Sequence, residues 1–143
     1  MTKRLIELFV FVAVALWLAD TQASAEIRPL GPSGPSITGL TGVQVGRSFE
    51  LVVAAGSHQG QLQVAEASAW MPAHGHGLEQ EPVVQVRSPS KTAVKGLIFQ
   101  MGGDWVLTLR LRDGSSWYAV RIGITCTGRT CLVVDTKTEA LAL

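Results

Sequence analysis

Several features that point to catalysis or to nucleic-acid binding are missing from this sequence. The formal net charge is only +1 and no block of like charge occurs, so the basic face that nucleic acid requires is absent. There is no Gly-x-Ser-x-Gly nucleophile elbow and no phosphate loop with its lysine, and the carboxylates are scattered without a clear acid/base pair. We therefore expect neither a nucleic-acid-binding protein nor an enzyme.

Cysteine is scarce as well. The chain has two cysteines, Cys126 and Cys131, separated by a Thr-Gly-Arg-Thr stretch that can form the turn of a short hairpin. In an oxidising compartment such a pair is most simply a disulfide, and we predict one here. A metal or redox pair is the alternative, although two thiolates alone do not complete a tetrahedral metal shell.

Long apolar runs are confined to the beginning of the chain. Lys3 and Arg4 precede a largely apolar run from Leu5 to Leu18, and Ala23-Ser24-Ala25 then supplies a small-residue cleavage site. The run is shorter than the about 20 residues that span a membrane. We predict a cleaved signal peptide over residues 1–25, and hence a periplasmic or secreted protein whose mature chain has no membrane span. An uncleaved anchor is the alternative.

The segments at the two ends of the mature chain carry no strand pattern. Residues 26–42 are rich in proline, glycine and serine, which cannot propagate a helix or a central strand. We expect them to form a lead-in or tether to a domain that spans residues 43–135. Residues 136–143 are expected to be a C-terminal tail that forms a short helix or is disordered.

After the predicted signal peptide, no segment of helix length shows apolar residues that repeat every 3.6 residues, the spacing typical of an amphipathic helix. Apolar residues instead alternate with polar ones in short segments, and the alternation in residues 61–70 is imperfect unless a bulge lies near Val64-Ala65. Asp113-Gly114-Ser115 is a strong hairpin turn between two such segments. Six or seven short strands at this spacing predict a single all-β domain, an antiparallel β-sandwich, with a small barrel as the alternative.

The stretch from Trp70 to Leu78 gathers two of the three histidines and one of the three methionines. His74 and His76 are separated by one residue, so in an extended segment their side chains project to the same side. Two imidazoles with the Met71 thioether suit copper, most naturally Cu(I), whereas zinc lacks a fourth ligand nearby. A structural loop with hydrogen-bonded histidines is the alternative interpretation.

Two other residues bear on this site. Met101 is a second candidate thioether ligand, but it shares a face with Leu97 and Phe99, and this parity favours a core role. The remaining histidine, His58, stands in a glycine-flanked turn and is expected to be a solvated loop residue.

Two segments carry a resemblance to a known family. Trp70-Met71-Pro72-Ala73-His74-Gly75-His76-Gly77, followed by the stretch from Val94 to Leu109, resembles the YtkA-like domain, which is related to FixH-type proteins. The similarity covers about Val43 to Thr125. By position, the Met-Pro-x-His-x-His and Phe-x-Met-x-Gly-x-Trp stretches of the family fall on Met71, Pro72, His74, His76, Phe99, Met101, Gly103 and Trp105. Gly102 stands where a proline commonly follows the second methionine.

The resemblance implies an exported immunoglobulin-like sandwich, often linked to copper handling or terminal-oxidase assembly. Together with the residue chemistry it gives our first functional hypothesis, an exported domain that binds copper through Met71, His74, His76 and Met101. Such a domain would act as a copper carrier or oxidase-assembly accessory, with a membrane-bound oxidase or a copper-handling protein as partner. The competing hypothesis is a metal-free accessory or interaction module of an envelope complex.

Overall fold

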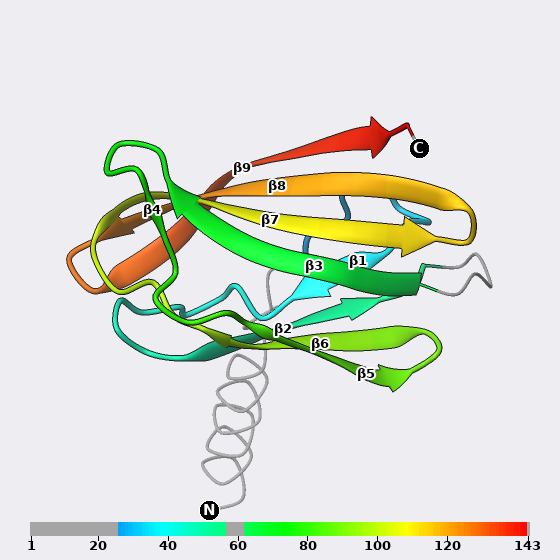
Figure 1. Cartoon of the computed structure of the whole chain (residues 1–143), viewed down its shortest axis with the longest axis horizontal. Helices are drawn as coiled ribbons and strands as arrows, with labels where there is room; N and C mark the ends of the chain where they lie inside the picture. The colour runs from blue at the N-terminus through cyan, green and yellow to red at the C-terminus, as the bar shows by residue number, and fades with distance from the viewer. Residues whose placement is uncertain (1–25, 57–61, 143) are drawn as a thin grey trace, which may run out of the picture.

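The computed structural model describes residues 26–56 and 62–142, in which the chain forms nine strands and no helix. The strands are β1 (Ser36–Thr38), β2 (Phe49–Ala54), β3 (Leu62–Met71), β4 (His76–Gly77), β5 (Val83–Ser88), β6 (Lys91–Leu97), β7 (Gly103–Asp113), β8 (Ser116–Thr127) and β9 (Thr130–Leu141). They form a four-stranded and a five-stranded antiparallel sheet packed face to face (Figure 1). The prediction of an all-β sandwich is confirmed.

The strand order resembles that of an immunoglobulin domain. The sheets read β1-β2-β6-β5 and β4-β3-β7-β8-β9. If β1, β2, β3, β5, β6, β7 and β8 are lettered A to G, the two sheets contain A-B-E-D and C-F-G, the order of a constant-type immunoglobulin sandwich. β4 adds two residues beside the end of β3, and β9 adds a full-length strand beside β8.

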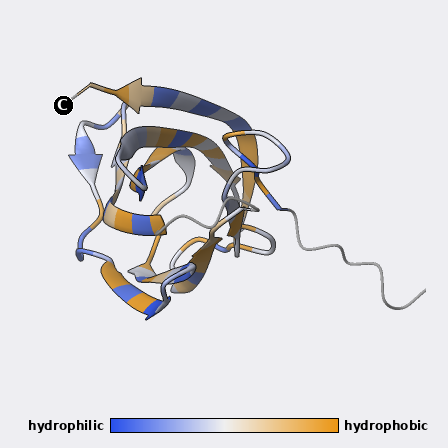
Figure 2. Ribbon diagram, turned by 90° about the vertical axis from the view of Figure 1, so that its right-hand side faces the viewer, coloured by the Kyte–Doolittle hydropathy of each residue, from blue (hydrophilic) through white to orange (hydrophobic). Residues whose placement is uncertain are grey.

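The core lies between the sheets, and alternation of hydrophobic and hydrophilic residues is visible along several strands (Figure 2). In β7, Trp105, Leu107, Leu109 and Leu111 are buried, while the residues between them face outward. Each such side chain stabilises the fold by about 1.5–3 kcal/mol relative to an exposed position. The expected bulge is present, because the register of β3 against β7 shifts between Val64 and Glu66 and so restores the alternation.

Both predicted hairpin turns are confirmed. Asp113 pairs with Ser116 across the β7–β8 turn, and Thr127 pairs with Thr130 across the β8–β9 turn. Each turn begins with a glycine of positive φ, as a two-residue hairpin loop requires. Cys126 and Cys131 lie directly opposite one another beside the second turn and form the predicted disulfide.

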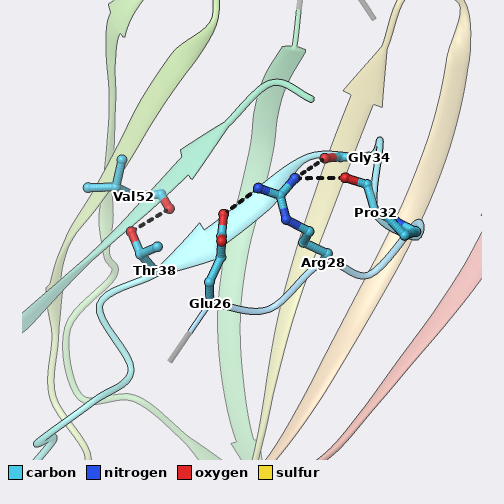
Figure 3. Close-up of polar contacts among 6 residues, drawn as sticks. All are labelled: Glu26, Arg28, Pro32, Gly34, Thr38 and Val52. Atoms are coloured by element: carbon cyan, nitrogen blue, oxygen red, sulfur yellow. Dashed lines mark hydrogen bonds and ion pairs between the residues drawn. The ribbon is translucent and has the colours of Figure 1, made fainter. Parts of the chain in front are cut away.

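The proline- and glycine-rich segment is part of the sandwich rather than a tether. β1 pairs with β2, and Ile37 is fully buried in the core. The turn that precedes β1 is held by the Arg28 guanidinium, which donates hydrogen bonds to the carbonyl oxygens of Pro32 and Gly34, at 3.1 and 3.3 Å. The same guanidinium forms an ion pair with Glu26 (Figure 3). The composition excludes a central strand, but it is compatible with the edge strand that forms here.

The expected C-terminal tail is also incorrect. Residues 136–141 continue β9, and Leu141 still pairs with Trp117 of β8. β9 is an edge strand that is exposed along most of its length, so it has no buried face to impose the alternation by which strands are found in a sequence. The domain therefore begins before residue 43 and extends beyond residue 135.

The predicted signal peptide and His58 lie outside the described residues. Within the described ranges, no helix is long and apolar enough to cross a membrane.

Candidate metal centre

The histidine-rich stretch forms a hairpin at one end of the five-stranded sheet. β3 ends at Met71 and β4 begins at His76, and these two residues pair across the hairpin. The turn closes because the amides of His74 and Gly75 both donate to the Met71 carbonyl oxygen, at 3.2 and 2.9 Å. Gly75 has a φ of 66°, a left-handed conformation that glycine adopts without strain.

This turn brings the two histidines together, although not through the extended backbone that the sequence suggests. Their ring centroids lie 6.0 Å apart, with His74 exposed and His76 half-buried. Metal–nitrogen bonds of about 2.0 Å from two imidazoles to a single ion place the ring centres roughly 5–6 Å apart. The observed separation therefore fits a shared ion with a wide angle between the two nitrogens.

The backbone orients one of the two rings. Nδ1 of His76 lies 3.2 Å from the carbonyl oxygen of Gly77. A carbonyl only accepts hydrogen bonds, so this contact requires the proton on Nδ1 and leaves the lone pair of Nε2 for a metal. Histidine ligands usually donate their second ring N–H in this way, which fixes the tautomer and the ring plane.

Trp105 joins the hairpin to the β6–β7 connection. The His76 ring meets the indole edge-on at a centroid distance of 5.9 Å, and the indole Nε1 donates to the Met101 carbonyl oxygen at 3.1 Å. The indole is almost completely buried and also packs against Phe99. One rigid ring therefore sets the positions of both His76 and the Met101 backbone.

One of the two candidate methionine ligands is exposed and the other is buried. Met101 is 40% exposed, so the core role that its parity favours is wrong. β6 ends at Leu97, and the chain then leaves the extended geometry, so the strand parity no longer applies at residue 101.

Met71 is fully buried, and its side chain occupies the space left by a glycine. A Cβ added to Gly103 would lie 2.8 Å from the Met71 Cε. In this conformation the Met71 side chain, including its thioether, packs inside the core at the base of the hairpin. Its thioether therefore does not face solvent in this conformation.

Gln100 is a further contributor that sequence reasoning missed. Its Nε2 donates to the Gly77 carbonyl oxygen at 2.9 Å, the same atom that His76 contacts. Its Oε1 is buried and has no hydrogen-bond partner among the residues that the structure describes. Gln100 belongs to no motif of metal-ligand type, so only the structure reveals that it braces β4.

The described residues do not form a metal site of the usual protein ligand types. Within residues 26–56 and 62–142, no three side chains of the His, Cys, Asp and Glu types come together. Cys126 and Cys131 are bonded to each other and offer no thiolate. Two nitrogens and a thioether sulfur form an incomplete set for zinc, but they suit a soft ion of low coordination number.

Comparison of the chain with models of protein families, with curated proteins and with solved structures finds no match. The resemblance to the YtkA-like domain therefore stays a prediction.

Proposed function

We propose that this protein is an exported β-sandwich that binds Cu(I) on the β3–β4 hairpin and transfers it to another protein. The observation that supports the proposal most is the 6.0 Å separation of the His74 and His76 rings. The backbone carbonyl of Met101, whose side chain is partly exposed, accepts a hydrogen bond from the same Trp105 ring that His76 contacts. These contacts support a site that combines the two imidazoles with the Met101 thioether.

The chemistry of these donors favours Cu(I) over other ions. Thioether sulfur is a soft ligand that suits Cu(I), and imidazole suits copper and zinc alike. Structural zinc sites are almost always four-coordinate, and among the described residues no third His, Cys, Asp or Glu side chain joins the two histidines. A two- or three-coordinate Cu(I) ion needs nothing more than His74, His76 and one methionine.

The proposal assigns the thioether ligand to Met101 and a supporting role to Met71. The Met101 side chain is partly in solvent and can approach an exposed ion without disturbing the core. Met71 is expected from the sequence to be a ligand, but it would first have to leave a fully buried position, at a cost of about 2–5 kcal/mol if its packing were lost entirely.

An incomplete ligand shell suits a carrier. His74 and Met101 are exposed, so a ligand from a partner can reach the ion before the first ligands dissociate. The partner that fits this chemistry is an acceptor of Cu(I), such as a copper-handling protein or a membrane-bound oxidase during its assembly. Copper is then the cargo of the protein and not a permanent cofactor.

A competition titration tests the proposal. The protein, isolated from the periplasm of an expression host, is titrated with Cu(I) in the presence of a chromogenic chelator. We expect one equivalent of Cu(I) to be withdrawn from the chelator. The double substitution His74→Ala/His76→Ala should abolish this competition, whereas His58→Ala should leave it unchanged. Equal affinity in the double variant and the wild type would refute the site.

A metal-free interaction module is the second candidate, and one surface feature favours it. Trp70 is half exposed and lines an open groove of about 470 Å³ between β3 and the segment that leads into β5. Exposed tryptophan beside a groove is typical of docking sites. In this case a pull-down from envelope extracts would depend on Trp70 and would be insensitive to copper chelators and to His74→Ala/His76→Ala.

A further inference from the structure

One side of the sandwich is left open between the edges of its two sheets. β5 is the outermost strand of the four-stranded sheet, and only the two residues of β4 lie outside β3 in the five-stranded sheet (Figure 1). β4 pairs with Trp70 and Met71, and no described residue pairs with the same edge of β3 from Leu62 to Ala69. A strand edge without a partner can accept an extended segment of another protein.

A bulge shortens the part of this edge that a second strand can follow. The register of β3 against β7 shifts between Val64 and Glu66, which places Ala65 in β3 as an extra residue. Beyond the bulge, β3 pairs regularly with β7 from Glu66 to Trp70. A segment bound to the free edge can therefore pair only with the stretch from Glu66 to Ala69. So short a pairing needs the support of side-chain contacts, because each backbone hydrogen bond adds little net stability in water.

A groove follows this stretch of β3. It is lined by every residue from Ala65 to Trp70 but by only one residue of β5, Val84, so an occupant lies against β3 rather than β5. Trp70 is 50% exposed, whereas Leu78 and Val84 are partly buried and pack against the core. The groove therefore offers an apolar floor and an accessible indole. The wall opposite β3 consists of Gly77, Leu78, Gln80, Glu81, Pro82 and Val84.

The charged side chains at this groove are carboxylates. Glu66 and Glu81 line it, and no lysine or arginine is among the described residues that do. Glu66 already pairs with Arg110, at 3.4 Å. Glu81 and its near neighbour Glu79 are exposed, and neither forms an ion pair with a described residue. A negative rim beside an apolar floor is complementary to a partner that carries both aliphatic and basic side chains.

We propose that this groove binds an extended segment of a partner protein in which aliphatic residues alternate with lysine or arginine. The backbone of the segment pairs with the stretch from Glu66 to Ala69, and its aliphatic side chains enter the groove. A basic side chain reaches Glu81 and lies against the Trp70 indole, whose π-face attracts a cation. This inference rests on the second candidate function, the interaction module, and not on copper binding.

Fluorescence anisotropy with a labelled synthetic peptide tests this proposal. The probe is a heptapeptide of alternating valine and lysine with blocked ends, titrated with the protein while a copper chelator is present. We expect a dissociation constant on the order of 100 µM. A matched peptide with glutamate in place of lysine should bind at least tenfold more weakly, because Glu81 repels it. A lysine peptide with N-methylated backbone amides should lose binding to a similar extent, because it cannot donate to the edge of β3.

Three variants of the protein locate the peptide. Glu81→Gln should weaken binding of the lysine peptide by about two- to fivefold, as expected for an exposed ion pair. Trp70→Ala should weaken it by about tenfold. The control Glu139→Gln removes a carboxylate from β9, at the opposite edge of the same sheet, and should leave binding unchanged. Thermal melts check the fold of each variant, and Glu81→Gln keeps the test decisive if Trp70→Ala fails to fold.

Several results would overturn the proposal. Equal binding of the lysine and glutamate peptides, or an equal loss in Glu81→Gln and Glu139→Gln, would show that no specific basic segment is recognised. A dimer that excludes the peptide in sedimentation velocity would assign the groove to a second copy of the chain. A pull-down that depends on Trp70 without any peptide binding would refute this class of partner and leave the interaction module itself standing.

Discussion

Replacing Gly103 tests how the core supports the candidate metal centre. Gly103 has a φ of 122°, which a residue with a side chain adopts only with strain, and the added Cβ would lie 2.8 Å from the Met71 Cε. The conformational strain costs about 1–3 kcal/mol and the overpacking of a buried methionine adds about 1 kcal/mol or more. We therefore expect Gly103→Ala to destabilise the protein by roughly 2–4 kcal/mol.

Chemical denaturation measures this loss, and the melting temperature should fall by about 10 °C. Gly96→Ala is a matched control, because Gly96 also has a positive φ but its missing Cβ would meet open space. Gly96→Ala should therefore lower the free energy of unfolding clearly less than Gly103→Ala does. In the Met71→Ala background, Gly103→Ala should lose the packing part of its effect, which a double-mutant cycle resolves. A Gly103→Ala protein within about 1 kcal/mol of the wild type would refute the close packing of Met71 on this strand.

Four further variants test the structure. Met71→Ala should cost about 2–5 kcal/mol in denaturant unfolding because its side chain is fully buried, whereas Met101→Ala should change stability by less than about 0.5 kcal/mol. Serine at both Cys126 and Cys131 should lower stability by about 2 kcal/mol, and addition of a reductant should then cause no further loss. Ile37→Ala should cost about 2–4 kcal/mol, and a neutral result would mean that the proline-rich segment is a tether after all.

The fold could be read from the sequence wherever a strand has one buried face. The alternation in β7, the glycine turns and the bulge near Ala65 all follow from local rules of backbone geometry and burial. The edge strands could not be read in this way. β1 is three residues long among prolines, and β9 is exposed on both faces, so neither shows a period-2 pattern.

The candidate site was predictable in its residue types but not in their environments. His74 and His76 stand close together because a turn at Gly75 folds the chain, whereas their spacing predicts an extended segment. The exposed position of Met101 depends on where β6 ends, and the roles of Trp105 and Gln100 depend on contacts between distant segments. No local pattern encodes such contacts.

Copper K-edge X-ray absorption of the Cu(I)-loaded protein tests the central claim most directly, because it identifies the atoms bound to the metal. We predict two imidazole nitrogens and one thioether sulfur bound to the metal, with the sulfur kept in Met71→Leu and lost in Met101→Leu. A first shell without imidazole, or a sulfur that disappears with Met71 and not with Met101, would contradict the proposed site.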